Sequence, residues 1–159
     1  MAACIAGATR TLQVSNAYFV PTVAFVDALC AARERGVDVR VMVPGPYHDQ
    51  TIVQRASRHT WPRLLQAGVG LYEYQPTMMH AKTLIADGEL LLVGSINFDP
   101  RSFALNAEFG VVIVDRTLAA EAERVFEADI MRCKPVQAAH RGLVSRGVDA
   151  VCYWARAQL

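Results

Sequence analysis

An Asp-Gly pair, Asp87-Gly88, separates two short apolar runs, AKTLIA and ELLLVGS. Asp-Gly is strongly favoured in a two-residue β-hairpin with a type I′ turn, because both turn residues need positive φ. The pattern therefore predicts adjacent antiparallel strands over residues 81–86 and 89–95. Since a hairpin returns the chain to its starting end, residues before the first strand are expected beside residues after the second.

The rest of the chain alternates between helix and strand patterns. Helices are predicted over residues 22–36 with Thr22 as N-cap, over 51–67 with Pro62 as an interruption or restart, and over 117–133. Further strands are predicted over 11–21 (running into a loop), 37–45, 69–75 and 107–115. This order predicts an α/β domain, with a layered, mixed β-sheet flanked by helices.

The composition fits one globular domain and limits its partners. The 159 residues are 53% hydrophobic and 19% charged, which excludes a disordered chain. A formal net charge of +1 supplies no overall field that would draw the protein onto nucleic acid or an anionic membrane. Any anion must therefore be bound by a local cluster of side chains, and nucleic acid is not an expected partner.

Signals that direct a chain through a membrane are also missing from these residues. No apolar run approaches the roughly 20 residues that span a bilayer, and residues 1–10 are too weakly apolar for a signal peptide. The four cysteines are scattered without a C-x-x-C pair, so neither a disulfide framework nor a zinc site is expected. A reducing compartment fits this pattern best.

A tail follows Pro135, which divides the chain into a domain over residues 1–135 and a C-terminal helical tail over 136–159. Apolar residues recur in the tail at helical spacing, together with Arg141, Arg146 and Arg156. Two interpretations stay open. The tail is either a helix packed on the domain or a surface helix that touches lipid headgroups.

His80 and Lys82 stand two residues apart at the start of the first hairpin strand. Side chains alternate along a strand, so both are expected on one face. A neutral imidazole is a nucleophile or general base, and an ammonium beside it stabilises negative oxygens. The pair therefore predicts a site for attack on phosphorus, where negative charge builds on the non-bridging oxygens.

Ser95 and Asn97 are predicted to join this site from the end of the second hairpin strand. Their hydroxyl and carboxamide are short donors that suit phosphate oxygens, and Gly94 lets the backbone approach closely. Glu108 opens the next predicted strand. Its carboxylate is expected to hold one nitrogen of His80 and leave the other free.

These residues also have ordinary structural interpretations. A single histidine is more often a surface or core residue than a catalytic one. Asp87 has the strongest structural case, since Asp-Gly suits a type I′ turn. Asp99 fits an N-cap or turn, with Arg101 as its ion-pair partner. The joint spacing, rather than any one side chain, indicates chemistry.

The spacing H-x-K-x-x-x-x-D followed by G-S-x-N resembles the signature of the phospholipase D superfamily. Six positions carry it: His80, Lys82, Asp87, Gly94, Ser95 and Asn97. Flanking segments such as NAYFVP and VGSINFDPRSFALNAEFGVVIVDR resemble the second catalytic half of bacterial cardiolipin synthases of the phospholipase D type. The resemblance implies one half of a phospholipase D-like fold.

The resemblance also implies a phosphatidyltransferase with a phosphohistidine intermediate. His80 would attack the phosphodiester phosphorus or, as the partner histidine, protonate the leaving alcohol. The phosphoryl oxygens would be bound by Lys82, Ser95 and Asn97. Glu108 would orient His80, and Asp87 would complete the catalytic motif as a support near the turn rather than as a reacting group. The implied substrate is a phosphatidylglycerol-like phospholipid, with no metal or other cofactor.

The active site of this superfamily takes one such motif from each of two halves, and this chain has one. His48, His59 and His140 lack the spacing. We therefore expect the C-terminal part of a longer enzyme, whose other half supplies the second motif. The alternative is a homodimeric phosphodiesterase, a phospholipase D or nuclease, with one motif per chain. The resemblance further implies a peripheral position at the membrane surface, on the cytoplasmic side of a bacterial cell membrane.

Overall fold

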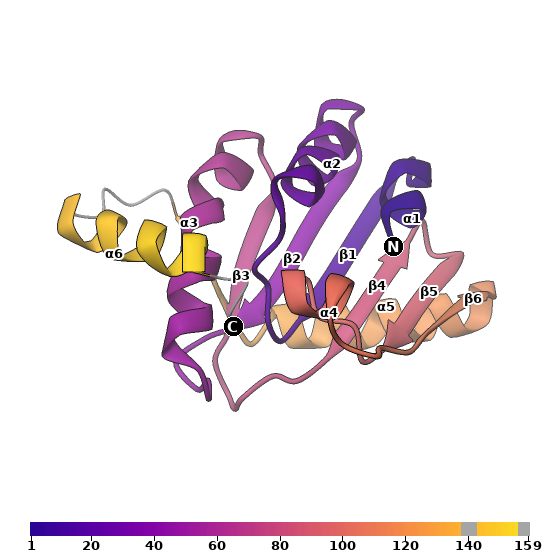
Figure 1. Cartoon of the computed structure of the whole chain (residues 1–159). Coiled ribbons are helices and arrows are strands. Elements are labelled where there is room, and N and C mark those ends of the chain that lie inside the picture. The colour runs from indigo at the N-terminus through magenta and orange to yellow at the C-terminus, as the bar shows by residue number, and fades with distance from the viewer. Residues whose placement is uncertain (138–142, 156–159) are drawn as a thin grey trace.

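The computed structural model describes residues 1–137 and 143–155, and it contains a seven-stranded sheet with helices on both faces (Figure 1). The strands are β1 (Thr11–Asn16), β2 (Asp38–Pro44), β3 (Gly70–Tyr74), β4 (Lys82–Ala86), β5 (Leu90–Gly94), β6 (Gly110–Val114) and β7 (Cys133–Pro135). The helices are α1 (Ala2–Gly7), α2 (Val23–Glu34), α3 (Thr51–Gln66), α4 (Pro100–Ala104), α5 (Arg116–Ile130) and α6 (Leu143–Trp154). The strand order is β6-β5-β4-β1-β2-β3-β7. The predicted α/β class is confirmed.

The sheet joins a parallel half to an antiparallel half. β1, β2 and β3 are parallel, with Val14 opposite Val41 and Val41 opposite Leu71, because α2 and α3 carry the chain back between them. β4 is antiparallel to β1, with Leu84 opposite Val14, and β5 and β6 continue in antiparallel pairing. The carboxyl ends of β1 and β2 therefore share an edge of the sheet with the start of β4 and the end of β5.

Alternation along the strands sorts the core side chains between the two faces. Val41 and Leu84 belong to a buried cluster on the side of α2 and α3. Their neighbours Met42 and Ile85 pack on the opposite side with Phe126 of α5. Because both faces of the sheet are covered, its central strands are apolar on both sides, as in other α/β layers.

The turn between β4 and β5 has the predicted geometry. Asp87 has a φ of 57° and Gly88 a φ of 65°, as a type I′ turn requires. Thr83 pairs with Val93, so the residues before β4 and those after β5 lie at the same end of the hairpin. The predicted hairpin is confirmed.

The helices α3 and α2 differ in detail from the sequence expectation. α3 runs unbroken through Pro62. Its buried side, which includes Trp61 and Leu64, packs on the sheet and offsets the hydrogen bond that proline removes. α2 does begin after Thr22, although the Thr22 side chain makes no capping hydrogen bond.

Asp99 is confirmed as the N-cap of α4. Its carboxylate accepts a hydrogen bond from the Ser102 N–H at 2.8 Å, and Pro100 occupies the first turn. The predicted ion pair with Arg101 is wrong, since no salt bridge within the described ranges joins the two. The sequence pattern also missed α1, α4 and β7, which are too short to show a period.

The tail forms a helix against the domain over the residues described. α6 lies along α3, and its Tyr153 is buried in a small cluster with Val53 and Ala56 of α3. Arg141 and Arg156 lie outside the described residues. The division of the chain at residue 135 stays a prediction.

Asp87 ties the hairpin to the start of β1. Its carboxylate accepts hydrogen bonds from the backbone N–H groups of Thr9, Arg10 and Thr11 at 2.9, 2.7 and 2.9 Å, and from the Thr9 hydroxyl at 2.9 Å. Burial by itself raises the pKa of Asp87, but the hydrogen bonds from Thr11, Arg10 and Thr9 outweigh burial and lower that pKa. Asp87 is therefore a structural support.

Replacing Asp87 by Asn should destabilise the fold. Asn still tolerates the left-handed turn, but its amide hydrogens face the N–H donors of residues 9–11. We expect the free energy of unfolding at pH 7 to fall by about 1–3 kcal/mol, measured by urea unfolding. Because the folded pKa is depressed, this difference is present above the unfolded pKa of about 3.9 and disappears as the pH falls through the lower folded pKa.

A matched control is Glu121→Gln, which removes an exposed carboxylate from α5. Its effect should stay below about 0.5 kcal/mol. An Asp87→Asn variant as stable as the wild type at pH 7 would contradict the supporting role.

Candidate active site

Lys82 begins β4 with its side chain buried, whereas His80 is exposed in the preceding loop. The Lys82 Nζ lies 3.2 Å from Nδ1 and 3.1 Å from Nε2 of His80, and it donates to the His80 backbone oxygen at 3.0 Å. His80 precedes the strand, so strand alternation is not what aligns the two side chains. The predicted contact between the imidazole and the ammonium is nevertheless present.

Burial of Lys82 removes solvation from its ammonium group. It is 9% exposed. Burial lowers the pKa of Lys82, and the charges of Glu108 and Asp49 act against that decrease. A buried cation that destabilises the fold, in contact with an exposed histidine, indicates a functional position.

Glu108 lies in the loop before β6 and accepts three hydrogen bonds. The donors are Ser95 Oγ, Ser102 Oγ at 3.0 Å and Asn106 Nδ2 at 3.3 Å. The bond from Ser95 is the main cause that lowers the pKa of Glu108, partial burial opposes it, and the remaining donors and the charge of Lys82 add to the lowering. No hydrogen bond joins Glu108 to His80 in the part of the chain that is described. The expected orienting contact is therefore not made within this chain, because these donors occupy the carboxylate.

A close approach of β5 and β6 sets the position of Ser95. Its N–H donates to the Phe109 oxygen at 2.8 Å, and the Phe109 N–H donates to Ser95 Oγ at 3.0 Å. A methyl group at Gly94 would lie 2.2 Å from the Phe109 oxygen, so only glycine fits. The prediction that Gly94 permits a close backbone approach is confirmed.

Replacing Gly94 by Ala should separate β6 from β5 and displace Ser95. We expect the free energy of unfolding to fall by about 1–3 kcal/mol or more, measured by urea unfolding. Gly7→Ala is the matched control, since nothing lies within 4 Å of its added methyl group. That variant should be as stable as the wild type or slightly more stable, because alanine favours helices. Equal stability of the Gly94→Ala variant would contradict the account.

Asn16, at the end of β1, holds the loop that carries Asn97. Its Nδ2 donates to the Ile96 oxygen at 3.3 Å, and its Oδ1 accepts from the Phe98 N–H at 3.0 Å. Asn16 is 1% exposed and stands opposite Lys82 in the β1–β4 register. The sequence analysis missed this residue. The available signal was a polar side chain at the end of a predicted strand.

The Asn97 side chain is incompletely satisfied. Its Oδ1 is buried and has no hydrogen-bond partner among the residues that the structure describes. Buried polar atoms are nearly always paired. The Asn97 Oδ1 is therefore a buried acceptor without a donor among the described residues.

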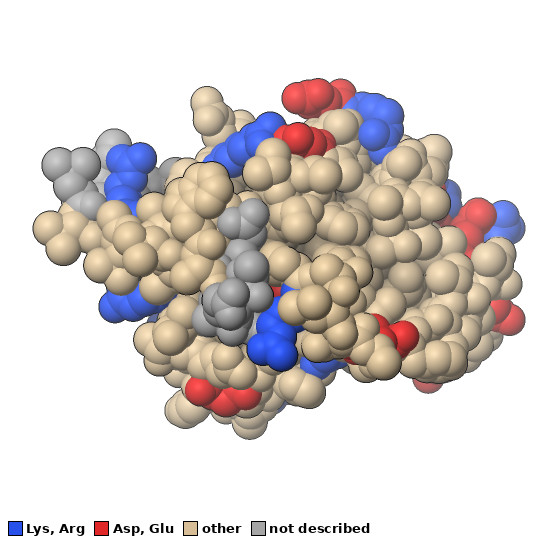
Figure 2. Space-filling model, viewed as in Figure 1, with Lys and Arg blue, Asp and Glu red and all other residues tan. Residues whose placement is uncertain are grey.

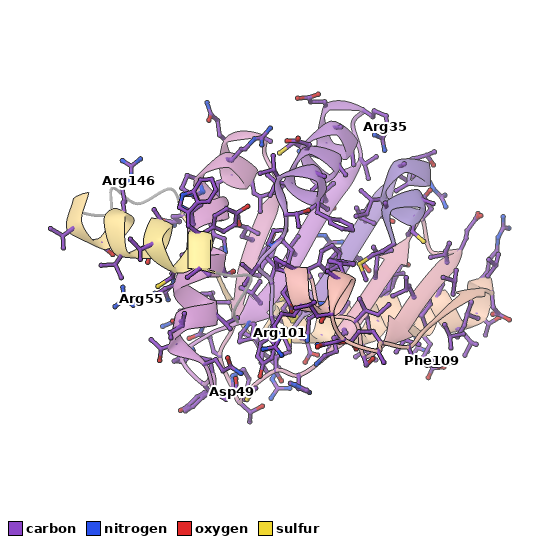
Figure 3. The ribbon with its side chains drawn as sticks, in the orientation of Figure 1. Arg35, Asp49, Arg55, Arg101, Phe109 and Arg146 are labelled. Atoms are coloured by element: carbon purple, nitrogen blue, oxygen red, sulfur yellow. The ribbon has the colours of Figure 1, made fainter. Side chains whose placement is uncertain are left out.

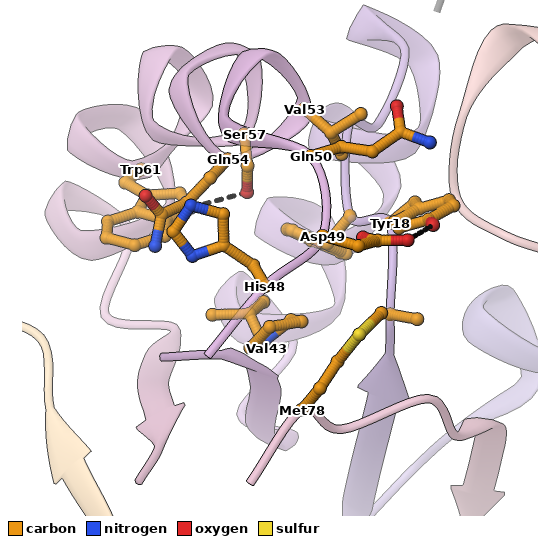
Figure 4. Close-up of a pocket in the computed structure, with 13 residues that line it drawn as sticks. Tyr18, Val43, His48, Asp49, Gln50, Val53, Gln54, Ser57, Trp61 and Met78 are labelled. Carbon is orange, nitrogen blue, oxygen red and sulfur yellow. Dashed lines mark hydrogen bonds between the residues drawn. The ribbon is translucent and has the colours of Figure 1, made fainter. Parts of the chain in front are cut away.

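Tyr18 and Asp49, from the loops after β1 and β2, form a further pair (Figure 4). Tyr18 Oη donates to Asp49 Oδ2 at 2.5 Å, and the Tyr18 ring meets the His80 ring edge-on with centroids 6.1 Å apart. Burial and the bond to Asp49 raise the pKa of Tyr18 to about 12, so its hydroxyl stays a donor at neutral pH. The sequence analysis missed both residues.

Tyr18 and Asp49 line a small pocket of about 20 Å³. Its other walls include Val43, Trp61 and Met78, and it is mostly apolar inside. The pocket opens at the carboxyl ends of β1 and β2, where open α/β sheets commonly bind ligands. Its volume leaves room for little more than one water molecule.

The hairpin separates Asp87 from this site. Asp87 follows the other end of β4, which is five residues or roughly 17 Å long. At the edge of the sheet where β4 begins, the structure places five of the predicted site residues: His80, Lys82, Ser95, Asn97 and Glu108. Within residues 1–137 and 143–155, no group of three or more His, Cys, Asp or Glu side chains is arranged to hold a metal ion.

Comparison with known sequences decides the family. Residues 1–130 match the family described as "Cardiolipin synthase, PLD-like domain". The chain belongs to this family. The resemblance to the phospholipase D superfamily that the H-x-K motif indicated is thereby confirmed.

Curated relatives agree with this assignment. The chain is 40% identical over 145 residues to a probable cardiolipin synthase of Bacillus subtilis, covering 89% of this chain and 29% of the relative. It is 37% identical over 150 residues to cardiolipin synthase A of Erwinia tasmaniensis, covering 92% and 31%. This PLD-like domain therefore spans about three tenths of the length of these relatives.

Solved structures confirm the fold. Nuc from Salmonella typhimurium, a phospholipase D family member, superposes with a TM-score of 0.78 at 23% identity, covering 86% of this chain and 88% of Nuc. A phosphatidylserine synthase of Haemophilus influenzae gives a TM-score of 0.74 at 13% identity, covering 99% of this chain and 43% of that one. The predicted half of a phospholipase D-like fold is confirmed.

Replacing Lys82 by Met should separate function from stability. Met fills similar space without a buried charge, so we expect the free energy of unfolding to stay equal or rise by up to about 1 kcal/mol. If Lys82 meets a phosphoryl group, as the motif implies, turnover by the active assembly should fall at least about 100-fold. Urea unfolding and product release measure the two effects.

Lys134→Met, on the exposed β7, serves as the control and should change neither quantity. A Lys82→Met variant that loses stability while it retains turnover would contradict the assignment.

Proposed function

We propose that the chain supplies half of the active site of a phosphatidyltransferase of the cardiolipin synthase type. The observation that carries the proposal is the buried Lys82 ammonium, 3.1–3.2 Å from the ring nitrogens of His80. The identity of about 40% to named cardiolipin synthases supports a phospholipid as substrate. An imidazole beside a buried cation suits attack on an anionic phosphodiester.

Transfer would proceed in two steps on His80. An unprotonated ring nitrogen attacks the phosphorus of a phosphatidylglycerol-like donor. The N–P bond forms as the P–O bond to the headgroup alcohol breaks, and a second histidine protonates that alcohol. An acceptor alcohol then attacks the phosphorus, the N–P bond breaks, and the second histidine takes the acceptor's proton. A second phosphatidylglycerol as acceptor yields cardiolipin and glycerol, and water yields phosphatidic acid.

Three side chains would bind the phosphoryl oxygens during transfer. Lys82 supplies a fixed positive charge, and the Asn97 Nδ2 would donate a hydrogen bond to a phosphoryl oxygen. The Ser95 hydroxyl donates to Glu108 in this chain, so it would turn toward a phosphoryl oxygen on binding. Glu108 then remains as the carboxylate that faces the Lys82 charge.

The second histidine would come from a second phospholipase D-like half or from a second copy of this chain. The segment that carries Ser95 and Glu108 also exposes Phe103, Leu105 and Phe109, which are 40%, 70% and 71% exposed. Figure 3 shows Phe109 at the outer edge of the molecule. β6 ends the sheet, and its Val114 is 79% exposed. Apolar surface around an incomplete site supports a partner at this face.

A homodimeric phosphodiesterase is the second candidate. The single H-x-K-x4-D motif favours it, because two copies of the chain would complete one site. The formal charge of +1 argues against nucleic acid as its substrate.

We also propose a peripheral position on the cytoplasmic side of the bacterial membrane. Four free cysteine thiols favour a reducing compartment. Over residues 1–137 and 143–155, no helix is sufficiently long and apolar to cross a bilayer.

Turnover of labelled phosphatidylglycerol in mixed micelles tests the proposal, with the mass of the chain measured by light scattering in the same sample. We expect cardiolipin and glycerol from a dimer, or from a monomer supplemented with the N-terminal part of a cardiolipin synthase relative. His80→Ala should abolish the product because the nucleophile is gone. Thr77→Ala, an exposed change in the same loop, should not.

Release of water-derived phosphatidic acid alone by a dimer would favour the phosphodiesterase. Turnover that survives in His80→Ala, or no turnover in either assembly, would contradict the proposed function.

A further inference from the structure

The outward face of α6 is apolar, although it meets solvent. Val144, Val148 and Val151 follow one another at i, i+4 and i+7, and they are 83%, 40% and 70% exposed. Trp154, one turn further on, is 75% exposed. A surface helix normally presents charged residues on this side. Here the four residues form an uninterrupted apolar stripe, the α6 stripe.

The inward face of α6 is fixed by separate contacts. Tyr153 is buried against α3, and its hydroxyl donates to the Pro21 oxygen at 3.2 Å. Asp149 is buried and lies 3.7 Å from Arg55 of α3. These contacts fix the orientation of α6 about its own axis. The α6 stripe therefore faces solvent rather than the domain.

Cationic side chains flank the α6 stripe. Arg146 and Arg55 lie on opposite sides of α6 (Figure 3), and Arg146 is exposed. In Figure 2 the surface over α6 is uncharged, with Lys or Arg side chains at its margins and no acidic side chain upon it. An apolar helix face with arginine at its edges and a tryptophan at one end is the pattern of helices that lie in a lipid interface.

The dimensions of α6 suit a position along a membrane surface. Its 12 residues are roughly 18 Å long, which is too short to cross the hydrocarbon layer. α6 also lies at the opposite end of the sheet from β6 and Phe109 (Figures 1 and 3). The surface expected to receive a second half of the enzyme is therefore distinct from the α6 stripe.

Tyr18 connects the base of α6 to the site. Its side chain packs against the cluster of Val20, Val53 and Tyr153 beneath α6, and its ring contacts the ring of His80. The helix that carries the α6 stripe is thus linked through Tyr18 to the ring of His80.

We propose that the α6 stripe docks the protein on an anionic phospholipid bilayer, with the valines and Trp154 among the headgroups and acyl-chain ends and with Arg146 at the lipid phosphates. The proposal rests on the proposed function, since a lipid substrate is what makes a bilayer the partner. The other possible occupants are a second copy of the chain and the second half of the enzyme.

Vesicle sedimentation with the full chain tests this surface. The probes are vesicles of phosphatidylcholine alone and of phosphatidylcholine with about one-third phosphatidylglycerol. The test variant is Val144→Asp/Val151→Asp. The control is Leu118→Asp/Val125→Asp, which places the same charges seven residues apart on exposed apolar positions of α5. Light scattering records the mass of each variant, and turnover of a short-chain phosphatidylglycerol below its micelle concentration is measured separately.

We expect the wild type to prefer phosphatidylglycerol vesicles, with a blue shift of tryptophan emission on binding. The α6 variant should bind them at least about tenfold more weakly, while the control keeps wild-type binding. Arg146→Gln should reduce the preference for the anionic vesicles. Mass and short-chain turnover should stay unchanged in all variants.

Three results would overturn the docking surface: equal vesicle binding by the α6 variant and the control, a fall in mass confined to the α6 variant, or loss of short-chain turnover confined to it. A fall in mass would assign the stripe to a second copy, and lost turnover would assign it to the second half of the enzyme. Vesicle binding that depends on the α6 stripe, without turnover by any variant, would overturn the proposed function and leave the docking surface in place.

Discussion

The carboxylate of Asp87 accepts hydrogen bonds from three successive backbone N–H groups at the start of β1, and the geometry of the site depends on that interaction. It fixes the hairpin of β4 and β5 against β1 in one register. A slip of one residue would turn every side chain of β4 to the other face of the sheet and move Lys82 out of register with Asn16. The aspartate of the H-x-K-x4-D motif therefore contributes to chemistry at a distance, by setting which side chains reach the opposite end of the strand.

At that end, the electrostatics are arranged for an anion. Lys82 is buried beside an exposed imidazole, with the charges of Glu108 and Asp49 near enough to counter the loss of solvation. The site is also unfinished, since Asn97 has a buried atom without a partner in the described chain and Phe109 is largely exposed. A cation and unsatisfied polar atoms reduce stability, and proteins keep such groups where binding or catalysis uses them.

Local patterns in the sequence predicted the parts of the structure that depend on local chemistry. Asp87-Gly88 predicted the turn, and turn geometry predicted which ends of the two strands meet. The spacing predicted that Glu108 lies near the site, but it did not predict the hydrogen bonds that Glu108 accepts. Two of the donors, Ser102 and Asn106, are positioned by α4, a helix too short to show a period in the sequence. Tyr18 and Asp49 were missed for a related reason. They follow different strands, and only the parallel pairing of β1 with β2 brings their loops together.

The central claim is that His80 carries the phosphatidyl group during transfer. The most direct measurement is mass spectrometry of the active assembly, quenched in alkali during turnover of phosphatidylglycerol because a P–N bond hydrolyses in acid. The account predicts a phosphatidyl adduct on the peptide that contains His80, which accumulates when the acceptor alcohol is depleted and disappears when it is restored. An adduct found only on a histidine of the partner half, or no adduct during active turnover, would contradict the claim.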